Sequence, residues 1–121
     1  MAQSVGLHEP GTDLAPETLD RHRALVSIQE ELEAVDWYAQ RVEAASDADL
    51  AAILAHNRDE EKEHAAMVIE WLRRHDPVLD RHLRTYLFTS GSVVGVESAA
   101  QPAAAEPSGS LAIGSLRGDQ P

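Results

Sequence analysis

The sequence contains no cysteine. This absence excludes disulfides, thiolate zinc sites and cysteine-ligated iron–sulfur clusters. Basic residues are scarce, with 10 Lys and Arg against 21 Asp and Glu and a formal net charge of -11. Such a chain repels nucleic acid and anionic membranes and attracts cations, so we expect neither as a partner. No membrane-length apolar run and no signal-like region occur, and we therefore expect a cytoplasmic protein.

Composition divides the 121 residues into four predicted segments. We predict a flexible N-terminal arm at 1–15, a helical domain at 16–89, a flexible linker at 90–108 and a terminal segment at 109–121. The helical domain is small, and small cores are marginally stable alone. We therefore expect the chain to form an oligomer.

Two long helices dominate the predicted domain. Pro16 suits a first helical turn, and neither Gly nor Pro follows until about Ala45. The second helix is expected to start with Ser46 as its cap, an acid three residues later, and to run to about His75. The short connection predicts an antiparallel hairpin. The apolar seam of the first helix is expected at Leu25, Ile28, Leu32, Val35, Ala39 and Val42.

A third, short helix is predicted to open at Asp76-Pro77 and to end near Phe88-Thr89. The fold class is therefore all-α: an antiparallel two-helix hairpin plus a short C-terminal helix. Beyond it, the Ala-, Ser-, Gly- and Pro-rich composition predicts a linker without a core, which leads to a short apolar island at 111–117.

A candidate metal site lies on the apolar stripes of the two long helices. Glu61 and His64 are three residues apart and project from one face of the second helix. Glu31 borders the seam of the first helix. Carboxylates directed into a core are costly unless they are paired or bind a cation, and few basic residues are placed to pair with them. The alternative for a Glu-x-x-His pair is a solvated acidic face.

Counting ligands links this site to assembly. Di-iron sites in four-helix bundles use a Glu from each of two helices and Glu-x-x-His from each of the other two. This chain carries half of that set, so a two-fold homodimer would complete it. Oxygen-rich ligands with one imidazole per metal suit iron, and manganese or zinc are alternative ions.

Other acidic and aromatic residues form weaker candidates. Glu30, Glu33 and Trp37 share the opposite face of the first helix, which suggests a subunit contact with a weak cation site or, equally, a solvated face. Tyr38 could hydrogen-bond a ligand carboxylate, or it could simply pack. The outer face of the second helix carries His56, Glu60 and Glu63. We expect a solvated face there, and a weak cation site is the alternative. The histidines without an evident partner are His8, His22, His75 and His82.

Two blocks of the sequence resemble the encapsulated ferritins. They are residues 30–38 (EELEAVDWY) and residues 56–64 (HNRDEEKEH), and the resemblance covers about residues 20–90. Residues 109–118 (GSLAIGSLRG) look like an encapsulin cargo-loading peptide, which is an independent match.

The resemblance implies a ferroxidase whose di-iron centre forms between two subunits, in a ring that is typically a decamer and has no storage cavity of its own. It implies Glu31, Glu61 and His64 as the catalytic metal ligands and Tyr38 as support for the centre. It implies a metal-access region at Glu30, Glu33 and Trp37, and weaker outer positions, where calcium, zinc or manganese could bind, at His56, Glu60 and Glu63. The surrounding encapsulin shell would store the iron, and it would dock the side chains of Leu111, Ile113, Leu116 and Arg117.

We therefore predict a ferroxidase that oxidises Fe(II) as cargo of an encapsulin nanocompartment. Two alternatives remain open at this point. The chain could be a non-catalytic scaffold whose oligomer is bridged by metal, or a di-iron peroxidase or oxidase acting on another substrate.

Overall fold

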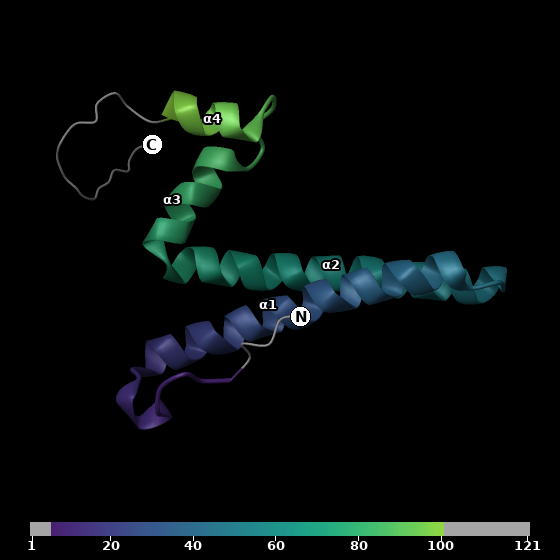
Figure 1. Cartoon of the computed structure of the whole chain (residues 1–121), viewed down its shortest axis with the longest axis horizontal. Coiled ribbons are helices and arrows are strands. Elements are labelled where there is room, and N and C mark those ends of the chain that lie inside the picture. Colours follow the sequence, from purple (N-terminus) through teal and green to yellow (C-terminus); the bar gives the residue numbers. More distant parts are fainter. Residues whose placement is uncertain (1–5, 101–121) are drawn as a thin grey trace. The chain divides into compact units, whose positions relative to one another are not determined.

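The computed structural model describes residues 6–100, and this range contains helices and no strand (Figure 1). The elements are a 3-10 helix η1 (Gly11–Asp13) and the helices α1 (Pro16–Ala44), α2 (Ala48–His75), α3 (Pro77–Tyr86) and α4 (Val93–Ala100). The all-α prediction is confirmed. The chain forms two units that meet at residues 77 and 78, and each is described by itself.

The hairpin of α1 and α2 forms the first unit. Pro16 occupies the first turn of α1, and the helix ends where Ala45 adopts an extended backbone and donates its N–H to Arg41 O at 2.9 Å. The connection to α2 is residues 45–47. Asp47, not Ser46 as predicted, caps α2, because its carboxylate accepts a hydrogen bond from Leu50 N at 2.8 Å.

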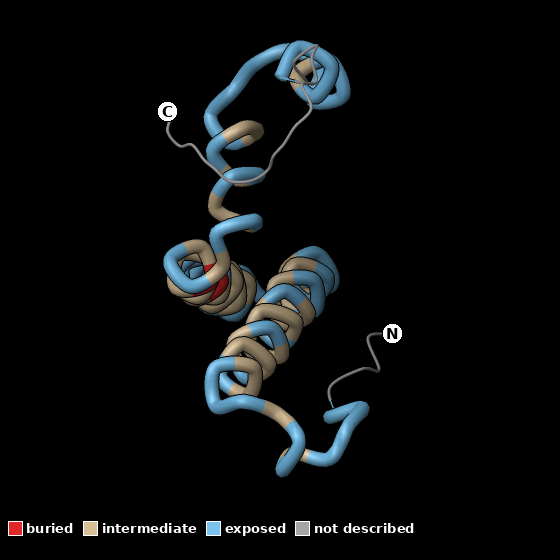
Figure 2. Tube along the Cα trace, turned by 90° about the vertical axis from the view of Figure 1, so that its left-hand side faces the viewer, coloured by how far each residue is buried: buried red, intermediate tan, exposed pale blue. Residues whose placement is uncertain are grey.

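The hairpin buries little of itself. Within the described range, the buried apolar residues are Ala65 and Leu72, each 4% exposed and both on α2. Figure 2 shows that most other positions of α1 and α2 are intermediate or exposed. Two helices form one layer, and a layer without a second one leaves an apolar face in contact with solvent.

The predicted seam of α1 divides into two faces. Ile28 and Val35 are half-buried, whereas Leu25 is 50% and Leu32 is 52% exposed. A 3-4-3-4 stripe covers a broad arc of a straight helix, and one partner helix contacts only part of that arc. Leu25 and Leu32 therefore do not pack within the single hairpin, and their place in a bundle seam stays a prediction.

The second unit contains α3 and α4. After α3, Leu87 N donates to Leu83 O at 2.9 Å, and Phe88 takes a left-handed φ of 63° with its side chain fully exposed. The helix α4 lies within the range predicted as a linker, and the prediction of no structure there is wrong for Val93–Ala100. Ser92 Oγ accepts from Gly95 N at 3.1 Å, and no proline interrupts residues 93–100, so this segment can form a capped turn and a helix, whose residues are exposed except for Val96.

Residues 6–15 include the short helix η1 within the predicted flexible arm. The terminal segment 109–121, with its predicted docking residues, lies outside the described residues. None of the described helices has both the length and the apolar character needed to cross a membrane.

Candidate metal centre

The hairpin brings three predicted ligands together. Glu31 lies near the middle of α1, and Glu61 and His64 lie one turn apart on α2. His64 Nδ1 is 3.4 Å from Glu61 Oε1 and 3.6 Å from Glu31 Oε1. One potential ligand atom from each residue lies within 4.8 Å of the other two. Within residues 6–100, no other group of three or more such side chains comes this close.

The two carboxyls shift each other's pKa in opposite directions. A side-chain hydrogen bond with Glu61, partial burial and the Glu61 charge raise the pKa of Glu31, and His64 only partly opposes this. The same hydrogen bond, donated by protonated Glu31, lowers the pKa of Glu61, with help from His64. Two carboxylates at this distance cannot both ionise without repulsion unless a cation joins them.

The histidine responds to the same charges. Partial removal from solvent acts to lower the pKa of His64, but the hydrogen bond with Glu61 and the charges of Glu31 and Glu61 outweigh it, and the pKa is raised. The cluster is thus a place where positive charge is favoured.

The basic residues nearest in sequence are engaged elsewhere. Asp59 binds Arg58 Nε at 3.0 Å and Lys62 Nζ at 3.3 Å through its Oδ1. These contacts lower the pKa of Asp59 and hold both cations to the outer side of α2. Two oxygen ligands and one imidazole within reach of a single ion, without a basic side chain between them, form a donor set that suits iron, manganese or zinc.

Access to the three side chains is open in the single chain. The exposed fraction is 25% for the Glu31 side chain, 24% for Glu61 and 42% for His64. They are therefore only partly buried, and the deep core position inferred from the apolar stripe is not reached within one chain. Each residue keeps a side that a second molecule or an ion can contact.

Other predicted site residues on α1 lie apart from this cluster. Glu30 and Trp37 are exposed and Glu33 is half-buried, and the structure does not bring these side chains into a group of three metal ligands. Tyr38 is half-buried, and the guanidinium carbon of Arg41 lies 5.2 Å from its ring centroid, in a cation–π contact.

The outer candidates of α2 form one ion pair. His56 Nε2 lies 3.5 Å from Glu60 Oε2, and both side chains are largely exposed, as is Glu63. These three do not meet as a group of metal ligands in the described residues.

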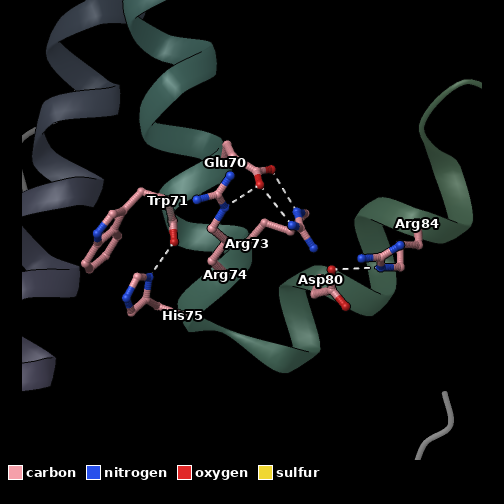
Figure 3. A network of polar contacts seen from close by, with 7 residues as sticks. All are labelled: Glu70, Trp71, Arg73, Arg74, His75, Asp80 and Arg84. Carbon is pink, nitrogen blue, oxygen red and sulfur yellow. Dashed lines mark hydrogen bonds and ion pairs between the residues drawn. The ribbon is translucent and has the colours of Figure 1, made fainter. Parts of the chain in front are cut away.

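Two polar contacts near the end of α2 were not predicted (Figure 3). Glu70 accepts hydrogen bonds from Arg73 Nε at 2.8 Å and from Arg74 Nε at 2.7 Å. His75, for which the sequence indicated no partner, stacks on Trp71 with ring centroids 3.9 Å apart, and its Nδ1 lies 2.7 Å from Trp71 O. The i, i+3 and i, i+4 spacings would have indicated both contacts.

An open groove lies beside the cluster. Its volume is about 470 Å³, and it lies between α1 and α2 with Ser27, Met67, Val68 and Trp71 among its lining residues. Met67 is three residues after His64 and is 58% exposed, as is Ile53. At about 100° per residue, Ile53, His64 and Met67 fall on one flank of α2. That flank carries two exposed apolar side chains, Ile53 and Met67, beside His64 of the three-residue cluster, together with the exposed Glu60.

The fold and the three-residue cluster together define a class of protein, an α-helical hairpin with a candidate carboxylate–histidine metal site. Residues 6–90 match the family model described as EncFtn-like, and the chain belongs to this family. The resemblance inferred from the sequence is confirmed.

Named relatives agree with this assignment. The chain is 57% identical to the "Encapsulated ferritin-like protein" of Rhodospirillum rubrum, over 98% of this chain and 94% of that protein. It is 48% identical to a "Ferritin-like protein" of Thermotoga maritima, over 90% of this chain and 96% of that protein. It is 39% identical to the "Encapsulin nanocompartment cargo protein EncC" of Myxococcus xanthus, over 76% and 80% of the two chains.

A solved structure shares the fold. The crystal structure of protein ne0167 from Nitrosomonas europaea is 61% identical, with a TM-score of 0.70 over 72% of this chain and 96% of that chain.

Proposed function

We propose that the chain is a ferroxidase, which oxidises Fe(II) to Fe(III) at a di-iron centre shared between two copies. The observation that carries this proposal is the cluster of Glu31, Glu61 and His64, whose ligand atoms lie within 4.8 Å of one another and in which the neighbouring Glu61 raises the pKa of Glu31. Membership of the EncFtn-like family supports iron as the metal.

Assembly follows from the ligand count. One hairpin supplies one Glu helix and one Glu-x-x-His helix, which is half of the set used by di-iron four-helix bundles. The partial exposure of all three side chains leaves room for the second half. The exposed flank of Ile53 and Met67 and the adjoining groove would be covered by the same second copy, and two hairpins would then form a four-helix bundle.

The residues divide the chemistry among them. Glu31 and Glu61, both as carboxylates, and neutral His64 through a ring nitrogen would hold the cation, and its binding would release any proton held by these groups. Bound Fe(II) would supply the electrons for reduction of dioxygen, and an oxygen-rich ligand set favours the ferric product.

Other residues would have supporting roles around the centre. Glu30, Glu33 and Trp37 would guide cations inward, and Tyr38, held by Arg41, would support the ligands. His56, Glu60 and Glu63 would hold cations only weakly, and calcium, zinc or manganese could take these outer positions.

The chain would work as cargo of an encapsulin nanocompartment in the cytoplasm. Support comes from the names of the relatives in Rhodospirillum rubrum and Myxococcus xanthus. Leu111, Ile113 and Leu116 would enter apolar pockets on the inner wall of the shell, with Arg117 as a polar contact, and the shell would store the iron. A ring-shaped decamer, assembled from dimers, is the expected cargo.

The function is tested by oxidation of Fe(II) under air, followed by the absorbance of Fe(III). We expect rapid oxidation by the wild type and near-background rates for Glu31→Ala. Equal rates for the two proteins would contradict the ferroxidase. Comparison of dioxygen with hydrogen peroxide as oxidant separates a ferroxidase that uses dioxygen from a peroxidase.

Cargo loading has its own test. Deletion of residues 110–121 is expected to abolish encapsulation by the co-expressed shell protein and to leave Fe(II) oxidation unchanged. Loading of the truncated chain would contradict the docking role of this segment.

A further inference from the structure

A methionine lies next to the metal cluster and has no part in the proposed ligand set. Met67 follows His64 by three residues on α2. Residues at this spacing lie one turn apart on a helix, with Cβ atoms about 5–6 Å from each other. Met67 is 58% exposed, although its side chain is apolar. A reactive thioether is thus held within one helical turn of the candidate nitrogen ligand.

The groove beside the cluster gives this thioether access to small molecules. Met67 lines the groove on α2, and Ser27, four residues before Glu31, lines it on α1. The groove therefore begins one helical turn from candidate ligands on both helices. Its volume of about 470 Å³ is many times the roughly 30 Å³ that one water molecule takes up in the liquid. The groove has room for a molecule such as hydrogen peroxide beside Met67.

Thioethers react with peroxides by transfer of one oxygen atom. The methionine sulfur attacks one oxygen of hydrogen peroxide, the O–O bond breaks as the S–O bond forms, and the other oxygen leaves as water once it has taken up the remaining proton. The sulfur is oxidised by two electrons and the peroxide is reduced by the same two. The reaction therefore needs no further reactant, and the product is methionine sulfoxide.

We propose that Met67 captures the peroxide produced at the metal centre, by conversion of its thioether to the sulfoxide. This inference rests on the proposed ferroxidase, in the form in which two Fe(II) and one dioxygen take up two protons and give two Fe(III) and hydrogen peroxide. One peroxide modifies one Met67, so complete modification needs about two Fe(II) per chain. Capture at Met67 keeps this peroxide from the His64 ligand.

Trp71 is a second oxidisable side chain that lines the groove, and it is less well placed. It is seven residues from His64, about two helical turns, whereas Met67 is one turn away. One face of its ring is covered by His75, with centroids 3.9 Å apart and an interplanar angle of 18°. Peroxide itself oxidises thioethers, whereas a hydroxyl radical attacks indoles as well. The residue that gains oxygen therefore reports which oxidant the centre releases.

A methionine introduced on the same helix provides the control. Leu50 is 47% exposed and lies fourteen residues before His64, which is about 21 Å along the helix. Exchange of Leu for Met nearly conserves side-chain volume. Full-length Leu50→Met protein receives Fe(II) in air in portions of about one ion per chain, up to about two. Peptide mass spectrometry then measures the sulfoxide at each position.

We expect at least about fivefold more sulfoxide at Met67 than at position 50, with or without catalase in solution, because peroxide is captured before it leaves the centre. Adding Glu61→Ala should remove this preference. Hydrogen peroxide added without iron should oxidise the two positions to within about twofold, because their exposure is similar.

Four outcomes would overturn the capture. They are equal oxidation of the two positions with iron, loss of the preference in the presence of catalase, the same preference with added peroxide alone, and oxygen gained by Trp71 in place of Met67. The absorbance of Fe(III) in the same samples separates the two proposals. Normal Fe(III) formation with unmodified Met67 overturns the capture and leaves the ferroxidase, whereas absence of Fe(III) overturns both.

Release of peroxide gives a second readout. Met67→Leu should oxidise Fe(II) at an initial rate within about twofold of the wild type, because the change nearly conserves volume and leaves the ligands in place. It should release at least about threefold more peroxide during the first two Fe(II) per chain, measured with a peroxidase-coupled dye. Ile53→Leu, also 58% exposed on this flank, is the matched control and should release as little as the wild type. Equal release from Met67→Leu and the wild type would overturn the capture.

Discussion

Two carboxylate clusters on α2, around Glu61 and around Glu70, have opposite electrostatic environments. Glu61 meets another carboxyl, that of Glu31, and the pKa of Glu31 is raised while that of Glu61 is lowered. Glu70 meets two guanidinium groups, Arg73 and Arg74, whose hydrogen bonds lower its pKa from 4.5 to about 2 (Figure 3). Both carboxylates are on the same helix and are only partly exposed.

This difference in environment distinguishes Glu70, a carboxylate neutralised by neighbouring arginines, from Glu61, a carboxylate without an arginine or lysine partner within the described residues. The charge of Glu70 is balanced by the chain itself, so it has no need of an ion. The cluster of Glu31, Glu61 and His64 has two acids whose ion pairs within residues 6–100 involve no Lys or Arg, so a metal ion could supply the missing positive charge. An acidic residue in this chain is thus a metal-ligand candidate when its own neighbours fail to neutralise it.

Removal of a ligand carries the largest expected effect. Glu61→Ala and His64→Ala should each lower the initial rate of Fe(II) oxidation by more than about 100-fold, because even residues that only support metal ligands change activity by about 10–100-fold. Glu70→Ala is the matched control, an identical truncation nine residues along the same helix, and should retain the full rate. The rates are measured by stopped-flow absorbance at fixed iron-to-protein ratio. A comparable loss in Glu70→Ala would remove the distinction between the two clusters.

Metal dependence of assembly is the next largest effect. If the cluster is completed by a second copy, ions that bind only the paired form favour it by mass action. We expect Fe(II) under anaerobic conditions, or Zn(II) as a redox-inert substitute, to raise the associated fraction at low micromolar protein, and EDTA to reverse this. Analytical ultracentrifugation measures the fractions.

The control for assembly is again the second cluster. Glu70→Ala should respond to metal as the wild type does, whereas Glu61→Ala should not respond. A wild type that stays monomeric with metal and is still an active ferroxidase would contradict the shared centre.

The sequence predicted much of the hairpin because helix signals are local. Pro16 and the short connection placed both helices to within a residue or so, and the spacing of Glu61 and His64 placed both on one face. The position of Glu31 opposite them followed from antiparallel pairing of two helices of nearly equal length.

Other features depend on surroundings that a periodic pattern does not contain. Which part of the seam faces α2 depends on helix rotation, so the exposure of Leu25 and Leu32 was not predicted. The choice of Asp47 over Ser46 as the cap is a one-residue difference between two good capping residues. Helix α4 is short and rich in Ala and Val, and such composition also suits a linker.

Smaller effects are expected on thermal stability, and they also distinguish the cluster around Glu61 from the cluster around Glu70. In EDTA near pH 7, Glu31→Gln should raise Tm by about 1–4 °C, because it removes repulsion between two carboxylates while keeping the hydrogen-bonding shape. Glu70→Gln should lower Tm by about 1–3 °C, because it weakens two ion pairs on the helix surface. Differential scanning calorimetry measures both shifts. Shifts of the same sign would contradict the opposite environments of the two residues.

The pH dependence of these shifts is the smallest and most specific effect. The folded pKa of Glu70 is lowered to about 2, so its ion pairs stabilise the fold fully above the ordinary value of 4.5 and are lost as pH falls towards 2. The Tm difference between Glu70→Gln and wild type should therefore vanish as pH approaches 2.

Glu31 is expected to show the opposite pH dependence. The folded pKa of Glu31 is raised, so its contribution to the stability of the fold is present below 4.5 and is lost as pH rises. Glu31→Gln keeps the neutral form at every pH, and its advantage over wild type should be absent in acid and grow towards neutral pH. Calorimetry from pH 2 to 7 in EDTA measures the two curves, which diverge in opposite directions as pH rises if one carboxylate is neutralised by arginines and the other has no positively charged partner except a metal ion.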